Sequence, residues 1–122
     1  MGTPTTHRDV IAWRQAMALV EDIDQATRRF PRAEAFELAA RIRSTAFAVP
    51  AHLAEGATRG SIGALVEHLG ISCSSLAALD TQLEIAVRLG YLEPDAQAVI
   101  ATRRLGFLVT ALRDALENPA RH

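Results

Sequence analysis

The chain has 122 residues, which is enough for one domain with a continuous hydrophobic core. Hydrophobic residues make up 49% of it and aromatic residues 5%, a composition that suits helices packed closely through small aliphatic side chains. The formal net charge is −1, so the chain as a whole has no electrostatic attraction to polyanions.

Cysteine content and hydropathy indicate in which cellular compartment the protein is expected. The one cysteine, Cys73, excludes an intramolecular disulfide and is consistent with a reducing environment. Because it lies on an apolar stripe, we interpret it as a small core residue. The first residues lack the basic start and apolar run of a signal peptide, and no stretch has the ~18 uninterrupted apolar residues of a membrane span. We therefore expect a cytoplasmic protein with no membrane association.

The first predicted helix covers residues 9–29, where apolar residues recur at three- and four-residue steps. Its stripe is Val10, Trp13, Met17, Val20, Ile23 and Thr27. Asp9 is the expected N-cap, since its carboxylate can accept a hydrogen bond from a free amide of the first turn. Phe30 should end the helix, because a residue before proline is disfavoured in the α region.

The second predicted helix covers residues 33–55 and contains a proline. Its apolar stripe is Phe36, Ala39, Ile42, Ala46, Val49 and Leu53. Pro50 lacks an amide hydrogen and its ring clashes with the preceding turn, so the helix should bend there and continue. Gly56 is expected to end the helix in the left-handed conformation.

The third predicted helix is the longest, covering residues 62–89, with Ser61 as N-cap and Gly90 as the stop. One apolar row is Ile62, Val66, Leu69, Cys73, Leu76, Leu83 and Val87. A second row is Leu65, Ser72, Leu79 and Ala86, and Ile71, Ala78 and Ile85 widen the band further. This band is broader than one core needs, which indicates contact with another subunit.

The fourth predicted helix covers residues 94–116 and begins at Pro94, whose fixed φ suits the first helical position. The connections between the four helices are short, and short connections make neighbouring helices antiparallel. The sequence therefore predicts an all-α, up-down-up-down four-helix bundle forming a single domain over residues 1–122.

Several motifs together resemble one protein family over residues 9–116. They are Trp13, Phe30-Pro31, Val49-Pro50, Ala54-Glu55-Gly56, Arg59, Ser61, Thr81-Gln82-Leu83 and Leu89-Gly90-Tyr91-Leu92. Their spacing is similar to that of the four-helix bundle proteins related to those encoded by intervening sequences of bacterial 23S ribosomal RNA genes. The resemblance implies an all-α bundle, a ring-shaped homopentamer and no catalytic activity.

The chain also departs from that family in places. His52 replaces the usual asparagine, and Ala64 replaces an acidic capping residue. A cousin of similar fold, the accessory protein of diversity-generating retroelements, resembles a basic pentamer that binds a reverse transcriptase and nucleic acid. The near-neutral charge of this chain departs from that cousin.

Arginines crowd the junction between the first two predicted helices: Arg28, Arg29, Arg32, Arg41 and Arg43. In one interpretation, the first four contact nucleic acid or a nucleic-acid enzyme by neutralising phosphates. In the other, Arg28 and Arg29 complement the helix dipole, while Arg41 and Arg43 pair with Glu34 and Glu37. Both interpretations stay open at this stage.

A second set of polar residues is predicted to form either a pocket or a structural network: Arg43, His52, Glu55, Arg59 and Gln82. Glu55 and Arg59 are close enough in sequence to pair. Arg43 would cap carbonyls released by Pro50, and Gln82 would satisfy buried polar groups between helices.

The sequence predicts no metal, cofactor or enzymatic activity. A di-iron bundle needs Glu-x-x-His on two helices, whereas this chain has only the reverse order, His52-x-x-Glu55. The Walker phosphate loop is absent, and Cys73 and Ser74 have no adjacent base in sequence. The expected function is a non-catalytic, self-associating scaffold, with a homopentamer favoured. The alternative is an accessory protein that binds RNA or DNA.

Overall fold

The computed structural model of the chain describes residues 7–118, with side chains described from Val10 onward. It contains four helices: α1 (His7–Arg28), α2 (Arg32–Thr58), α3 (Ile62–Arg88) and α4 (Gln97–Glu117). Residues 7–118 contain no strand, so the predicted all-α, four-helix class is confirmed. The ends of the predicted domain, residues 1–6 and 119–122, lie outside the described residues.

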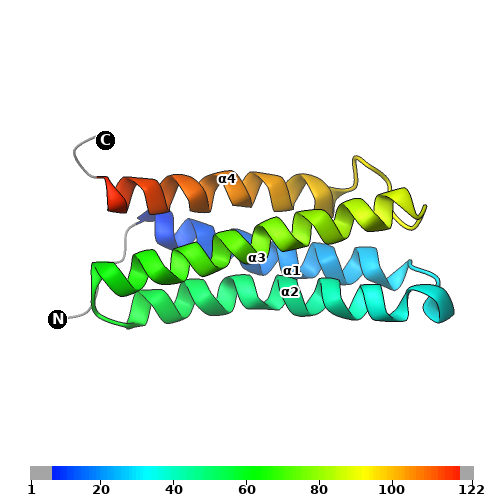
Figure 1. Cartoon of the computed structure of the whole chain (residues 1–122), viewed down its shortest axis with the longest axis horizontal. Helices are drawn as coiled ribbons and strands as arrows, with labels where there is room; N and C mark the ends of the chain where they lie inside the picture. Colours follow the sequence, from blue (N-terminus) through cyan, green and yellow to red (C-terminus); the bar gives the residue numbers. More distant parts are fainter. Residues whose placement is uncertain (1–6, 119–122) are drawn as a thin grey trace.

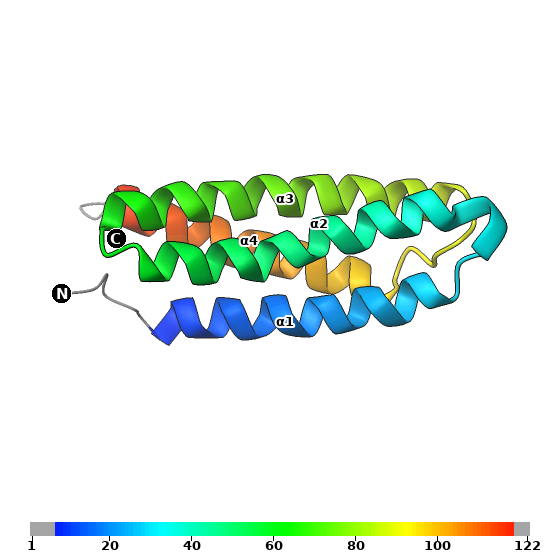
Figure 2. The same cartoon turned by 90° about the horizontal axis from the view of Figure 1, so that it is seen from below.

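The four helices lie side by side along the long axis, and successive helices run in opposite directions (Figures 1 and 2). Over the described residues, α1 packs against α2 and α4, and α3 packs against the same two helices. Helices α1 and α3 are therefore diagonal to each other, as Figure 2 shows. The groove between α1 and α2 and the groove between α3 and α4 consequently lie on opposite sides of the bundle.

The core consists of aliphatic side chains with alanines where helices approach closely. Its largest fully buried apolar side chains are Leu19, Ile23, Ile42, Val49, Leu69, Leu79, Leu83, Leu105 and Val109. Two buried hydroxyls are satisfied by carbonyls: Ser72 Oγ donates to Val49 O at 3.4 Å, and Thr102 Oγ1 donates to Ala98 O at 2.7 Å. These bonds remove the cost of burying a free polar group.

The predicted core stripe of α1 is wrong in its N-terminal half. The buried line along the whole of α1 is Ala12, Ala16, Leu19, Ile23 and Thr27, so the predicted stripe is right at Ile23 and Thr27. Trp13 is 40% exposed, and Val10 and Met17 are similarly exposed. The alanines face the core because their small side chains let α1 pack closely, so the larger apolar residues beside them are left at the surface. Phe36 in α2 is likewise 72% exposed, while Ala35 beside it is buried.

Other apolar predictions also differ from the structure at particular residues. Cys73 is half-buried rather than fully in the core, and its Sγ lies 3.6 Å from Thr110 Oγ1 in α4. Ile62 is exposed at the start of α3. In contrast, the row of Leu65, Ser72, Leu79 and Ala86 is fully packed inside. The core of α3 is thus centred on the second predicted row.

Two helix ends agree with the predictions. Ser61 Oγ accepts a hydrogen bond from the Ala64 amide at 3.1 Å and caps α3. Gly90 follows the end of α3 with φ of +81°, a conformation that glycine adopts without a Cβ clash.

Three further helix ends differ from the predictions. Helix α1 begins at His7, so Asp9 lies inside it and is not the N-cap; its side chain lies outside the described residues. Helix α2 continues through Gly56 to Thr58, and Gly60 takes the left-handed conformation with φ of +83°. Helix α4 begins at Gln97, three residues after Pro94. Packing decides the second case, because Gly56 is buried against α3.

The backbone of α2 has non-helical angles at Ala35, with φ of −115° and ψ of 17°. Pro50 is buried farther along the same helix. The bend predicted at Pro50 stays a prediction.

Helix α3 is long and apolar enough, by length and composition alone, to cross a membrane, with a mean hydropathy of 1.5 over an 18-residue window. A core helix of a water-soluble bundle meets the same criterion. Of that window 28% is buried inside the chain, and the exposed large apolar side chains of α3 are Ile62 and Ile85.

Candidate functional site

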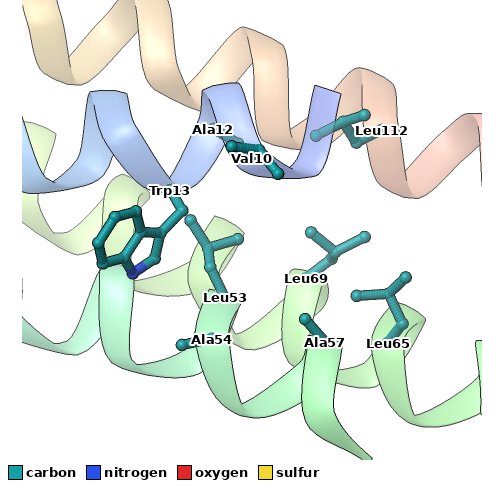
Figure 3. Close-up of a pocket in the computed structure, with 9 residues that line it drawn as sticks. All are labelled: Val10, Ala12, Trp13, Leu53, Ala54, Ala57, Leu65, Leu69 and Leu112. Atoms are coloured by element: carbon teal, nitrogen blue, oxygen red, sulfur yellow. The ribbon is translucent and has the colours of Figure 1, made fainter. Parts of the chain in front are cut away.

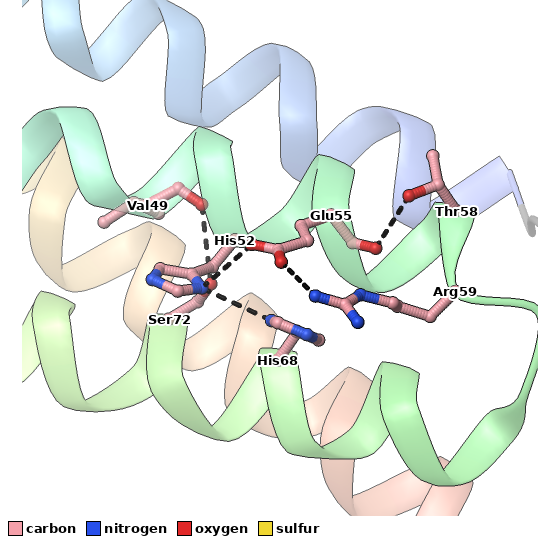
Figure 4. Close-up of polar contacts among 7 residues, drawn as sticks. All are labelled: Val49, His52, Glu55, Thr58, Arg59, His68 and Ser72. Carbon is pink, nitrogen blue, oxygen red and sulfur yellow. Dashed lines mark hydrogen bonds and ion pairs between the residues drawn. The ribbon is translucent and has the colours of Figure 1, made fainter.

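The most concentrated polar site lies between α2 and α3 and consists of His52, Glu55 and His68 (Figure 4). His52 and Glu55 are three residues apart and so lie on the same side of α2, whereas His68 comes from α3. The two imidazoles are stacked, with ring centroids 5.5 Å apart, and their Nδ1 atoms are 3.3 Å apart. We call these three residues the histidine–glutamate cluster.

Glu55 connects the cluster to Arg59. Its Oε2 lies 3.9 Å from His52 Nδ1, and its Oε1 accepts a hydrogen bond from Arg59 Nη2. That hydrogen bond is the main cause that lowers the pKa of the Glu55 carboxyl, and the charge of Arg59 adds to it. Glu55 therefore remains a carboxylate and presents one oxygen to the imidazole of His52.

A close contact between the helices brings His68 to the cluster. A Cβ built on Gly56 would lie 2.7 Å from His68 Cβ, a separation that no side chain can adopt. The absence of a side chain at Gly56 therefore lets α3 approach α2 at this level. The side chains of His52 and Glu55 remain 31% and 43% exposed, so the cluster opens to solvent.

The structure brings together three of the five residues predicted to form a polar pocket or network: His52, Glu55 and Arg59. His68 is not among the residues predicted from the sequence. A signal for it does exist, because His52 and His68 are each eight residues from Gly60, where the chain turns between α2 and α3. Residues equidistant from the turn of an antiparallel helix pair lie at about the same level along the bundle, so this spacing places the two histidines at one level.

The other two predicted network residues lie elsewhere. Arg43 Nε donates to Thr27 Oγ1 at 2.9 Å, and this bond links α2 to α1. Thr27 Oγ1 in turn donates to Ile23 O at 2.8 Å. Because Arg43 Nε bonds to Thr27 in α1, it does not take the predicted role of capping carbonyls near Pro50. Gln82 has a buried Oε1 without a hydrogen-bond partner among the described residues, so its predicted role in satisfying polar groups is not observed.

Only some arginines of the junction between α1 and α2 form hydrogen bonds or ion pairs with other residues of the chain. Arg28 Nε pairs with Asp24 Oδ2 at 3.0 Å, so one of the four arginines predicted to contact phosphate is already paired with a carboxylate. Arg29, Arg32 and Arg41 are exposed. Over residues 10–118, neither Arg41 nor Arg43 forms the predicted ion pair with Glu34 or Glu37.

Acidic groups lie close to part of the same junction. Arg29 shares a surface hollow with Asp22, Glu93 and Asp95. Burial raises the pKa of Asp22, and the nearby charge of Glu21 raises it further. The neighbouring hollow, between α1 and α2, contains Arg28, Arg32 and Phe36. The junction therefore has a basic side at the start of α2 and a mixed side near the α3–α4 connection.

An apolar groove opens between α1 and α2 (Figure 3). Trp13 stands over Leu53 and Ala54, and the groove floor reaches Leu69 of α3 and Leu112 of α4. Met17 is seven residues after Val10, and Phe47 is seven residues before Ala54, so each continues the groove along its own helix. We define the first apolar face as Val10, Trp13 and Met17 of α1 with Phe47, Ala54 and Ala57 of α2.

A second apolar groove lies between α3 and α4, on the opposite side of the bundle. Phe107 projects from it with 78% of its surface exposed, and Ile100 lies two turns earlier on the same side of α4. Arg103 beside them pairs with Asp80 Oδ1 at 3.1 Å, across the groove. We define the second apolar face as Cys73, Leu76 and Ala77 of α3 with Ile100, Gly106 and Phe107 of α4.

Two comparisons with known proteins bear on the identity of the chain. No curated protein matches it. The family model described as 23S rRNA-intervening sequence protein matches residues 8–104, which include most of α1, all of α2 and α3, and the first part of α4. This match covers most of the chain and confirms the resemblance seen in the sequence motifs. The chain therefore belongs to the 23S rRNA-intervening sequence protein family.

Proposed function

We propose that the chain is a non-catalytic scaffold that assembles with copies of itself into a closed ring, with five subunits favoured. The observation that carries this proposal is the pair of apolar faces on opposite sides of the bundle. The homopentamers implied by the sequence resemblance support the number five. The proposal places the protein in the cytoplasm, without membrane association.

The position of the two faces favours a ring over a two-fold dimer. A two-fold contact uses the same surface on both subunits, whereas a ring joins two different surfaces of each subunit. Here the first apolar face is concave around Leu53 and Leu69, and the second projects Phe107 outward. Seating Phe107 of one subunit in the first face of the next would repeat at every junction around the ring.

The size of the exposed apolar groups makes such a contact favourable. Burying a large apolar side chain contributes about 1.5–3 kcal/mol, and each junction would cover Phe107, Ile100 and Trp13. The bend predicted at Pro50 belongs to this proposal, because Pro50 lies between Phe47 and Ala54. A bend there would set the positions of these two residues along the first apolar face.

The direct test is the mass of the native protein in solution. Gel filtration with light scattering at micromolar concentration should give about five times the 13.2 kDa mass of one chain. A stable species with the mass of one chain would contradict the proposal. A species of two chains would retain self-association but exclude the ring.

A second candidate function is an accessory protein that binds RNA or DNA, directly or with a nucleic-acid enzyme. The observation that favours it is the exposure of Arg29, Arg32 and Arg41 at one end of the bundle, without ion pairs to Glu34 or Glu37 for Arg41. Three phosphate contacts per subunit would be multiplied around a ring, even with a net charge of −1 per chain.

This candidate predicts salt-sensitive binding to structured RNA or DNA at about 50 mM salt, where phosphate contacts are strongest. Replacing Arg29, Arg32 and Arg41 together by alanine should abolish the binding, because it removes the three proposed phosphate contacts. Each lost contact should also lower the magnitude of the slope of log K against log salt by about 0.9. Arg113→Ala, near the opposite end of the bundle, is the matched control and should bind normally. Fluorescence anisotropy measures both, and an absence of binding by the native protein would remove this candidate.

A further inference from the structure

We propose that His52, Glu55 and His68 form a binding site for a divalent transition metal ion, with Zn²⁺ as the best match. The site is separate from both apolar faces and from the arginine junction, so it goes beyond the proposed scaffold function. It departs from the expectation drawn from the sequence, because the third ligand comes from a different helix.

The distances in the cluster suit a metal of this size. One ligand atom from each residue lies within 4.8 Å of the other two. The two Nδ1 atoms are 3.3 Å apart. Zinc binds imidazole nitrogen at about 2.0–2.1 Å, so two nitrogens in a tetrahedral site lie about 3.4 Å from each other. The two histidines therefore already have the separation that one shared ion requires.

The third ligand needs only a small adjustment. Glu55 Oε2 lies 3.9 Å from His52 Nδ1, about half an ångström beyond the tetrahedral ligand separation. A rotation of this partly exposed side chain closes that gap. Arg59 already holds Oε1, the other oxygen of the same carboxylate. A ligating carboxylate is commonly oriented by such a second hydrogen bond, so Arg59 acts as a positioning residue.

The donor set decides which class of ion fits. Imidazole nitrogens suit zinc, copper, iron and nickel, whereas magnesium and calcium prefer sites made of oxygen ligands. Three protein ligands leave one tetrahedral position, and the solvent-facing side of the cluster leaves room for water there. The proposal concerns binding and a cross-link between α2 and α3, and it assigns no reaction.

The backbone supports the site at the point of closest approach. Gly56 follows Glu55 directly and packs on His68, so the helix contact that positions His68 depends on the residue next to a ligand. In the metal-free protein, the facing Nδ1 atoms can share one proton as a hydrogen bond. A metal ion would replace that proton and hold both rings.

The experiment uses the full chain, stripped of metal with a chelator and titrated with Zn²⁺ by calorimetry. We expect one ion per chain, and an increase in the midpoint of thermal unfolding when Zn²⁺ is present. Replacement of Zn²⁺ by Co²⁺ should give the strong visible absorption of a four-coordinate site. Binding by the native chain at other stoichiometry, or no binding, would overturn the proposal.

Variants locate the ion within the chain. His52→Asn and His68→Asn should each weaken Zn²⁺ binding by more than about tenfold and remove the thermal shift, since each loses a direct ligand. Glu67→Gln is the matched control, because Glu67 adjoins His68 without belonging to the cluster, and it should bind as the native chain does. Unchanged affinity in the His52→Asn/His68→Asn double variant would place the ion elsewhere and contradict the assignment. Circular dichroism before titration establishes that each variant is helical.

Discussion

Phe107→Glu is expected to convert the proposed ring into single chains at micromolar concentration. In the isolated chain the Phe107 side chain is 78% exposed, so its replacement removes little from the fold itself. Substitutions at such sites usually change stability by less than about 0.5 kcal/mol. In the assembly, however, a carboxylate would be buried against apolar groups without a partner, and that penalty reaches several kcal/mol.

Light scattering measures the loss of assembly, and circular dichroism measures the retained helix content. Gln97→Glu is the matched control, since it adds the same carboxylate at an exposed position of α4 outside the second apolar face. It should assemble like the native protein. A native-size assembly of Phe107→Glu would show that the second apolar face takes no part in self-association.

Mixing two variants distinguishes a ring from other assemblies. Ala54→Glu damages the first apolar face at an exposed residue, whereas Phe107→Glu damages the second. In a head-to-tail contact, each variant retains the face that the other lacks. The mixture should therefore form heterodimers with one intact junction and nothing larger. If the mixture restores the full native mass, or if neither variant binds the other, the pairing of these two faces is wrong.

Gly56→Ala is expected to destabilise the fold by about 1–3 kcal/mol, the usual cost of overpacking a close contact. Alanine normally stabilises a helix interior relative to glycine by about 1 kcal/mol. Here the added Cβ would lie 2.7 Å from His68 Cβ, so α2 and α3 must separate at this level. His68 Cβ is bonded directly to the backbone and cannot rotate aside, whereas Leu65 Cδ1 is in ordinary van der Waals contact. The clash with His68 therefore costs more than the gain in helix propensity.

Urea unfolding measures this effect most cleanly in the Phe107→Glu background, where assembly does not add to the apparent stability. Gly63→Ala is the matched control in α3, because an added Cβ there meets nothing within 4 Å. It should leave stability unchanged or raise it slightly. Equal stability of Gly56→Ala and the parent chain would contradict the close packing of α2 on α3 at this level.

Most of the fold could be predicted from local chemistry in the sequence. Helix starts and stops depend on neighbouring residues, which is why Ser61 and Gly90 were assigned correctly. The Glu55–Arg59 pair was predictable for the same reason, since residues four apart on a helix are always neighbours. The motifs spread along the four helices also determined the family, which the match over residues 8–104 confirms.

Tertiary packing decided the rest. Periodicity showed that α1 has an apolar side, but the close approach of the helices turned Ala12 and Ala16 inward and left Trp13 outside. Gly56 is compatible with a helix end or a helix interior, and its contact with His68 selected the interior. The histidine–glutamate cluster depends on the register between α2 and α3, which is set by packing across the Gly60 turn. Local patterns determine which segments become helices, whereas the faces they bury and the side chains they bring together depend on contacts between residues distant in sequence.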